Sequence, residues 1–258
     1  AQAADALRKS GQVKADKKSG RIAADGQVVI RSEGNRFIIL EANSETDFVA
    51  KDENFRAFID TVAATALAEG PADVEALMGL SVAGGTLEQA RTDLVAKVGE
   101  NISVRRFEII DASGPVDQYI HGGRIGVVVE LAGGDTALAK DVAMHVAASN
   151  PAYVSADDVP EEQLNKEREI LTAQALQEGK PENIVAKMVE GRLGKFLAEI
   201  TLTGQSFVKD PDVTVGKLLQ QAGASVTRFV RYEVGEGIEK KADNFVEEVM
   251  AQVSQSQD

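Results

Sequence analysis

Apolar residues in the first half of the chain predict a strand pair, two helices and a closing strand. The apolar runs 26–30 and 36–42 flank the turn Ser32-Glu33-Gly34-Asn35 and are predicted to pair as antiparallel strands. The turn at 43–46 leads into a predicted helix. Apolar residues at helical spacing form one stripe on it, and these are Phe48, Phe55, Ile59, Val62 and Ala66.

The rest of this half is predicted from the same patterns. Residues 69–86 are rich in Gly, Ala and Pro and are expected to form a loop with one short helix. A helix is predicted over 87–98, ending at Gly99, because glycine adopts the left-handed conformation that ends helices. A strand follows over 102–110.

The second half repeats this plan. A hairpin is predicted from 119–121 and 124–131 around Gly122-Gly123, and it is followed by a helix over 136–148 and a strand over 226–234. Ile38 matches Val127 in the first strands, and Arg106-Phe107-Glu108 matches Arg231-Tyr232-Glu233 in the closing strands. The number of residues that separates the two closing strands is larger than the number that separates the two first strands, so the second copy carries an insertion.

The insertion is predicted to be a helical hairpin. Two helical segments, 161–177 and 182–200, are joined by Glu178-Gly179-Lys180-Pro181, and each arm would be roughly 25–28 Å long at 1.5 Å per residue. Their apolar seam is predicted to contain Leu164, Leu171, Ile184, Met188, Phe196 and Ile200.

The predicted fold class is α+β, with two related subdomains built on small antiparallel sheets. The hairpin is inserted in the second subdomain, and a C-terminal helix is predicted over 244–253. The predicted divisions are a helix end and basic linker at 1–20, one subdomain at 21–111, the other at 112–235 with the hairpin at about 160–200, and a C-terminal helical module at 236–258.

Charge and composition exclude several functions. The formal net charge of −13 repels phosphate backbones and anionic membranes, so nucleic-acid binding would need a local basic patch. One such stretch, 8–21, is either a solvated linker or a contact with RNA or a partner. The chain has no cysteine, and its apolar runs are too short to cross a bilayer. Its first residues contain neither a secretory core nor an initiator methionine, which suggests a chain whose beginning has been removed.

No catalytic signature is present in the sequence. It contains no phosphate-binding loop motif, no dinucleotide fingerprint, no H-E-x-x-H and no G-x-S-x-G. With only two histidines and no cysteine, a transition-metal site would need mostly carboxylates. We therefore predict a protein that is not an enzyme, with no catalytic residues, no metal site and no cofactor.

The junction Thr46-Asp47-Phe48-Val49-Ala50-Lys51-Asp52 is the most distinctive local feature. Thr46 can cap the helix that follows, and Asp47 complements the positive end of its dipole. From the residues alone, Phe48 has a simple interpretation as the first core residue of that helix.

Five separated segments resemble one known family. They are NSETDFVAKDENF (43–55), LVAKVGENISVRR (94–106), AMHVAAS (143–149), KMVEGRLGKF (187–196) and TRFVRYEVGEGIEK (227–240). In this order they are similar to bacterial elongation factor Ts, and the resemblance runs from residue 1 to about 253. That family begins with a small ubiquitin-associated-like domain, and AADALRKSG is expected to be the end of its last helix.

The resemblance implies a cytoplasmic guanine-nucleotide exchange factor of translation elongation. Its partner would be elongation factor Tu, bound with GDP and then nucleotide-free, in a complex that can be of higher order. In the family, the loop with Thr-Asp-Phe-Val enters the partner beside its magnesium site. Carried over, Phe48 is a wedge, Asp47 lies at the mouth of the groove, and Thr46 and Val49 shape the loop.

The resemblance implies further partner contacts at Val98, Gly99, His121, Phe207, Val208, Phe245 and Val249. His145, inside a predicted helix, is interpreted as structural. Three other functions stay open at this point: an interaction protein that binds through the helical hairpin without exchange activity, an RNA-associated factor that uses residues 8–21, and an enzyme with dispersed carboxylates.

Overall fold

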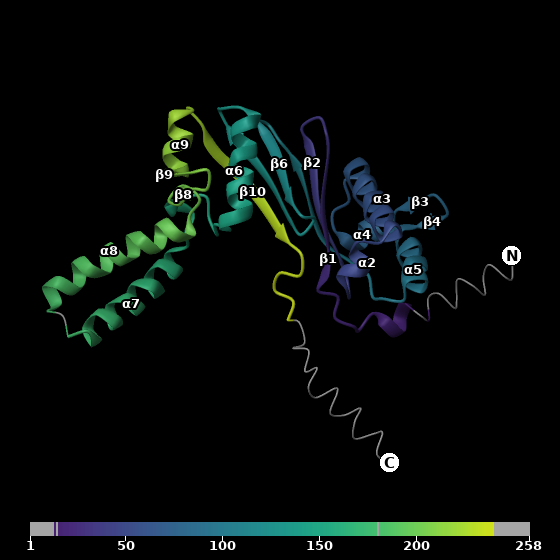
Figure 1. Cartoon of the computed structure of the whole chain (residues 1–258), viewed down its shortest axis with the longest axis horizontal. Helices are drawn as coiled ribbons and strands as arrows, with labels where there is room; N and C mark the ends of the chain where they lie inside the picture. The colour runs from purple at the N-terminus through teal and green to yellow at the C-terminus, as the bar shows by residue number, and fades with distance from the viewer. Residues whose placement is uncertain (1–12, 14, 180, 240–258) are drawn as a thin grey trace, which may run out of the picture.

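Two three-stranded antiparallel sheets form the centre of the molecule in the computed structural model, which describes residues 13, 15–179 and 181–239 (Figure 1). The strand order in the first sheet is β1-β2-β5, and these strands are β1 (Asp25–Glu33), β2 (Arg36–Ser44) and β5 (Ser103–Asp111). Its helices are α2 (Asp47–Ala50), α3 (Glu53–Glu69), α4 (Val74–Gly79) and α5 (Leu87–Val98). A small hairpin of β3 (Ser81–Val82) and β4 (Gly85–Thr86) precedes α5.

The second sheet has the order β10-β7-β6 and is built in the same way. Its strands are β6 (Val116–His121), β7 (Ile125–Ala132) and β10 (Ser225–Glu233). The helices that accompany it are α6 (Thr136–Ser149) and α9 (Val215–Gln221), and a small hairpin of β8 (Ser206–Phe207) and β9 (Asp210–Thr214) precedes α9. Thr214 caps α9 as Thr86 caps α5, which marks the two helices as equivalent.

The predicted duplication is confirmed, but its closing strands were aligned wrongly. β2 pairs Leu40 with Phe107, and β7 pairs the equivalent Val129 with Phe229. Both ladders also shift register at the same place, next to Glu41 in one and beside Arg228 in the other. Arg106 therefore corresponds to Arg228, and the predicted match with Arg231 is wrong by three residues.

Alternation along the central strands builds three apolar layers. Side chains of a strand point to opposite faces in turn, so Ile38 and Leu40 of β2 face the helices while Ile39 faces the second sheet. β7 behaves in the same way, with Val127 towards the helices and Val128 towards the first sheet. The three apolar layers thus lie between four layers of secondary structure, in the order helices, sheet, sheet and helices, as Figure 1 shows.

The two sheets approach each other closely at Gly126. A Cβ at this position would lie 2.5 Å from Cγ1 of Val28, so the packing requires a glycine. A backbone hydrogen bond joins the repeats in the same region, from Val28 N on β1 to the Gly123 carbonyl in the β6–β7 turn at 2.8 Å. The repeats are therefore joined by both apolar packing and a main-chain contact.

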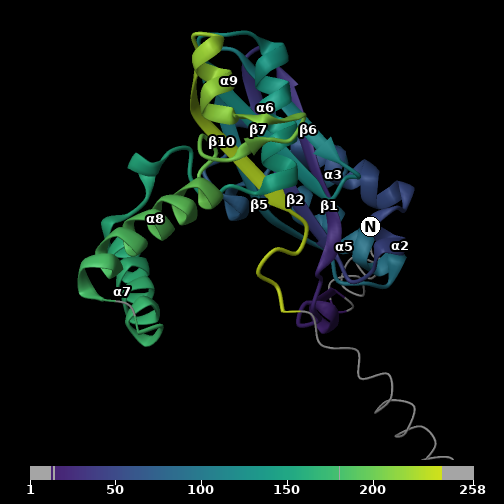
Figure 2. The ribbon, with the colours of Figure 1, turned by 60° about the vertical axis from the view of Figure 1, so that its left-hand side comes forward.

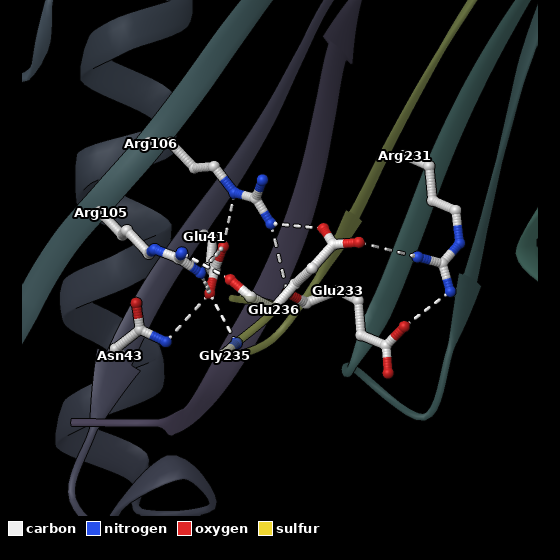
Figure 3. A network of polar contacts seen from close by, with 8 residues as sticks. All are labelled: Glu41, Asn43, Arg105, Arg106, Arg231, Glu233, Gly235 and Glu236. Carbon is white, nitrogen blue, oxygen red and sulfur yellow. Dashed lines mark hydrogen bonds and ion pairs between the residues drawn. The ribbon is translucent and has the colours of Figure 1, made fainter. Parts of the chain in front are cut away.

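A polar network also connects the repeats (Figure 3). The Glu41 side chain on β2 is fully buried and accepts hydrogen bonds from Arg106 Nε at 2.6 Å and from the Gly235 amide at 2.8 Å. Arg106 and Arg231 both contact Glu236, in the turn after β10, with N–O distances of 3.2 and 3.8 Å. The end of β10 is thus attached to β2 and β5 of the first repeat.

The inserted hairpin consists of α7 (Glu161–Gln177) and α8 (Glu182–Ile200), as predicted, and projects from the second repeat (Figure 2). A short 3-10 helix, η1 (Ala156–Asp158), precedes it. Its seam differs from the prediction on α8, where Ile184 is 45% exposed. Helix α8 carries two apolar stripes at four-residue spacing, one that starts at Ile184 and one that starts at Val185. The stripe that starts at Val185 packs against α7. The buried seam is Leu171, Ala175, Val185, Val189 and Leu193, with Leu164 and Phe196 packed against it.

Several other predictions can be compared with the structure. The α+β class and the main strands and helices are confirmed. Two small hairpins and α9 were not predicted from sequence. The helix end predicted in AADALRKSG and the C-terminal helix predicted over 244–253 lie outside the described residues, and the domain boundaries stay predictions. None of the described helices is long and apolar enough to cross a membrane.

Candidate functional site

The loop between β2 and α3 exposes an aromatic side chain. It folds into the single helical turn α2, in which Phe48 is 81% exposed while Ala50 is buried and Val49 packs against the core. The prediction that Phe48 starts the buried stripe of α3 is wrong. Asp52 caps a new helix by accepting hydrogen bonds from the amides of Asn54 and Phe55. This break turns Phe48 away from the stripe, which begins at Phe55.

The direction of this turn is fixed by a residue that the sequence analysis did not identify. Glu100 follows α5, and its Oε2 accepts hydrogen bonds from the amides of Glu45 and Thr46 at 3.1 and 3.0 Å. Its Oε1 accepts the Thr46 hydroxyl at 2.7 Å, while Thr46 Oγ1 accepts from Val49 N at 3.4 Å. The partners are more than fifty residues apart, so no local pattern could reveal the contact.

Asp47 is ionised and held at the start of the turn. Lys51 Nζ donates to Asp47 Oδ2 at 2.6 Å, and this hydrogen bond lowers the pKa of the Asp47 carboxyl. Arg124, in the neighbouring hairpin, adds a small further lowering of this pKa. The side chain is about half exposed, which leaves its carboxylate available to a partner.

The tip of the β6–β7 hairpin lies beside α2. Arg124 forms an ion pair of 3.0 Å with Asp25 at the start of β1, and Gln27 Nε2 donates to the Ala50 carbonyl at 2.6 Å. His121 is exposed at this tip, with its Nδ1 3.2 Å from the Tyr119 hydroxyl. The structure therefore brings the predicted residues of the Thr46 loop and His121 to the same end of the molecule.

Val98 and Gly99 also belong to this end, at the last turn of α5. Val98 packs partly against the first core cluster. Gly99 has φ of 83° and ends α5, and its carbonyl accepts a hydrogen bond from Lys18. The left-handed backbone explains the glycine without any partner contact.

Phe207 and Val208 lie apart from this group, in the second repeat near the base of the helical hairpin (Figure 1). Phe207 is buried, whereas Val208 is 48% exposed, so a partner could contact this segment through Val208. Phe245 and Val249 lie outside the described residues.

His145 is buried and structural, as predicted, and it fixes the Phe207 segment. Val208 N donates to His145 Nδ1 at 3.1 Å, so the ring is neutral and its Nε2 donates to Gln205 Oε1 at 2.9 Å. The ring of Phe207 packs 6.0 Å away. Burial lowers the pKa of His145, and the hydrogen bond to Gln205 offsets part of this effect.

This histidine predicts an acid-sensitive stability. Because its folded-state pKa lies below the ordinary 6.5, its contribution is complete above that value and is lost as the pH falls. Urea unfolding between about pH 5 and pH 8 should therefore show a stability decline that His145→Gln flattens. His121→Gln, at an exposed ring, is the matched control. Equal slopes for the wild type and His145→Gln would contradict this role.

The described residues contain no group of three or more His, Cys, Asp or Glu that could hold a metal ion. What the site offers instead is an exposed aromatic ring on a braced turn, next to an ionised carboxylate and a hairpin tip. Such a surface defines the class of proteins that act by binding another protein.

Comparison with known proteins identifies the family. The family model described as elongation factor TS matches residues 45–236. Three curated relatives bear the name elongation factor Ts: those of Thioalkalivibrio sulfidiphilus (60% identical, over 97% of this chain and 87% of the relative), Methylococcus capsulatus (58%, 98% and 88%) and Legionella pneumophila (57%, 96% and 86%). The chain belongs to the elongation factor Ts family.

Membership confirms the function that the resemblance implied. The chain is a nucleotide-exchange factor of translation elongation, and its partner is elongation factor Tu. An exchange factor changes the affinity of its partner for a nucleotide and catalyses no bond-making reaction.

Proposed function

We propose that the chain binds elongation factor Tu in its GDP-bound state, disturbs the magnesium and phosphate site, and then forms a stable nucleotide-free complex. It does so in the cytoplasm, without a cofactor and without binding nucleic acid or membrane directly. The observation that carries the proposal is the 81% exposure of Phe48 on a turn that other residues hold in place.

The physical requirement is a preference for the nucleotide-free partner. GDP and its magnesium ion are held by charge-assisted contacts, and only differential affinity can shift that equilibrium. Each tenfold acceleration corresponds to about 1.4 kcal/mol of such preference. A rigid aromatic ring suits this task because it buries a large apolar area at a low entropic cost.

We assign the roles as follows. Phe48 inserts into the partner, Asp47 contacts the mouth of its groove, and Thr46 and Val49 shape the turn. Additional contacts are proposed at Val98, Gly99, His121, the Phe207-Val208 segment, Phe245 and Val249. A higher-order complex is compatible with two separate contact regions, one at the end that carries the Thr46 loop and His121 and one at the Phe207-Val208 segment.

The test is the release of labelled GDP from elongation factor Tu, with and without this chain. We expect release to accelerate until the chain saturates, and a complex to persist once nucleotide is removed. Binding without acceleration at saturation would contradict the proposal and favour an interaction protein that uses the helical hairpin.

An RNA-associated role is disfavoured by contacts of the basic linker. Lys18 donates to the Gly99 carbonyl, and Arg21 lies 3.6 Å from the Glu45 carboxylate, so both cations already have partners within the chain. An RNA affinity that falls steeply with salt concentration would reverse this conclusion.

Deletion of the helical hairpin should leave exchange intact. The apolar seam of the hairpin forms a cluster of its own. The chain enters and leaves the hairpin at the isolated β-bridge between Tyr153 and Thr201. Replacing residues 160–197 by a short Gly-Ser linker should preserve the circular dichroism of the remainder and leave GDP release unchanged within about twofold. Loss of exchange in a folded deletion variant would show that the hairpin acts directly.

A further inference from the structure

The Glu100 carboxylate supports the start of the turn that carries Phe48, while Gln27 binds the Ala50 carbonyl at its end. One oxygen accepts the amides of Glu45 and Thr46, and the other accepts the Thr46 hydroxyl, all within 3.1 Å. These bonds act on the cap residue of α2, so they fix both where the turn begins and the angle at which it leaves β2.

The turn needs such support because it cannot hold its own shape. α2 spans four residues, and a single helical turn is unstable alone because nucleation fixes several dihedral angles for one hydrogen bond. Phe48 cannot anchor the turn either, since it is largely exposed. Inward packing of Val49 and Ala50 restrains one side, and the Ala50 and Thr46 carbonyls accept hydrogen bonds from Gln27 Nε2 at 2.6 Å and Ser44 Oγ at 2.9 Å. Glu100 adds the bonds to the amides of Glu45 and Thr46, which orient the start of the turn.

Glu100 is itself held in place by its neighbours. Asn101 N donates to Glu45 Oε1 at 2.7 Å, so the two loops exchange hydrogen bonds in both directions. The Asn101 side chain, which is mostly buried, donates to the carbonyls of Ser19 and Arg21 at 3.3 and 2.8 Å. The support is therefore a reciprocal clamp between the loop after β2 and the loop after α5, with the linker packed against it.

We propose that Glu100 is a positioning residue for exchange, which holds Phe48 in its binding direction before the partner arrives. This inference rests on the proposed insertion of Phe48 into elongation factor Tu. When the turn is clamped, little conformational entropy is lost on binding. When the clamp is removed, the turn occupies its binding conformation for only part of the time. The apparent affinity is reduced by that competent fraction, and saturation by the chain restores the rate.

The experiment measures the GDP-release rate from elongation factor Tu against chain concentration for Glu100→Ala and Glu100→Gln. For Glu100→Ala we expect a half-saturating concentration about tenfold higher and a maximal rate within about twofold of the wild type. Gln is isosteric: its oxygen can accept both amides, and its NH2 group can donate to Thr46 Oγ1. It should therefore restore the wild-type concentration dependence. Asp93→Ala, at an exposed acid on α5, is the charge-matched control.

Two further measurements separate positioning from other roles. In the free chain, hydrogen exchange of the Thr46 amide should be faster in Glu100→Ala and normal in Glu100→Gln, which tests the clamp without any partner. In a Phe48→Ala background, the effect of Glu100→Ala should be much smaller than in the wild type, because Asp47 is then the main proposed contact that the turn still positions.

Three outcomes would overturn the proposal. An unchanged half-saturating concentration in Glu100→Ala would show that the clamp does not matter for binding. Equal defects in Ala and Gln variants would show that the charge itself contacts the partner. An undiminished Glu100→Ala effect in the Phe48→Ala background would show an independent role. If Phe48→Ala alone left exchange unchanged, the proposed insertion would fail first, and the amide measurement would still report the clamp.

Discussion

Phe48→Ala should slow the chain-stimulated release of GDP by about tenfold to a hundredfold, equivalent to roughly 1.4–2.7 kcal/mol of lost differential binding. The free energy of unfolding of the free chain should change by less than about 1 kcal/mol, because the side chain is exposed and removing it opens no cavity. The measurements are urea unfolding of the variant alone and its GDP-release rate with elongation factor Tu.

Phe55→Ala is the matched control, since the same change is made seven residues further at a side chain with no exposure. It should lower the free energy of unfolding by about 3–5 kcal/mol through the cavity it leaves. Its folded fraction should still exchange normally. Phe48→Ala with large destabilisation and normal exchange per folded molecule would contradict the insertion of Phe48.

Asp47→Ala should weaken exchange less than Phe48→Ala. The carboxylate is half exposed and already paired with Lys51, so solvent screens much of its interaction with a partner. A defect that disappears at high salt would be consistent with a contact at the rim. A defect as large as that of Phe48→Ala would show that Asp47 is buried in the complex.

Local signals in the sequence were sufficient for most of the elements. Gly99 ends α5 because a left-handed residue is needed there, and the bounds of α7 and α8 follow from apolar residues at helical spacing before and after residues 178–181 of the sequence. The short elements were missed because β8, β9 and α9 contain too few residues to show a period. Their positions become evident only from the duplicated fold.

Two errors have a common physical origin in competing local patterns. Phe48 stands seven residues before Phe55, which fits one helical stripe, but Asp52 can cap a new helix and does so. Arg106-Phe107-Glu108 resembles Arg231-Tyr232-Glu233, but pairing with the central strands makes Arg228 the equivalent of Arg106. A local cap decided between the two patterns in the first case, and pairing of distant strands decided in the second.

At the candidate site, too, the sequence identified local features but not the contacts between distant segments. Caps and charges identified the turn from Thr46 to Val49, and the family resemblance supplied its role. The exposure of Phe48 and the support from Glu100 depend on contacts between distant loops, and no spacing rule contains them. The sequence thus predicts which turn is special, and the structure explains how it is held.

The second large effect concerns stability, and it is expected for Glu41→Ala. The carboxylate is fully buried and accepts hydrogen bonds from Arg105, Arg106, Asn43 and the Gly235 amide (Figure 3). Removing one partner of a fully buried charge pair costs about 3–5 kcal/mol. The lower end of this range is expected here, because both arginine side chains are partly exposed and Arg106 keeps its ion pair with Glu236. Urea unfolding of the variant at neutral pH measures this loss.

Glu130→Ala is the internal control from the other repeat. Glu130 occupies the position equivalent to Glu41, is also buried, and binds Ser113, Gly114 and Arg228 of its own repeat. Both variants should be destabilised. Only Glu41→Ala should accelerate hydrogen exchange at the Gly235 amide, since Glu41 alone of the two reaches the turn after β10.

The pH dependence of the free energy of unfolding distinguishes the contribution of the Glu41 charge from the contribution of its packing. Burial raises the pKa of this carboxyl, but the donors Gly235, Asn43, Arg106 and Arg105 outweigh burial and lower the pKa below 4.5. A carboxylate with a lowered folded-state pKa stabilises the fold above its ordinary pKa, and this contribution is lost as the pH falls through the folded value. Glu41→Ala should therefore flatten the acidic limb of the stability curve. A variant that is as acid-sensitive as the wild type would show that other carboxylates dominate acid unfolding and that Glu41 contributes mainly by filling space between the two repeats.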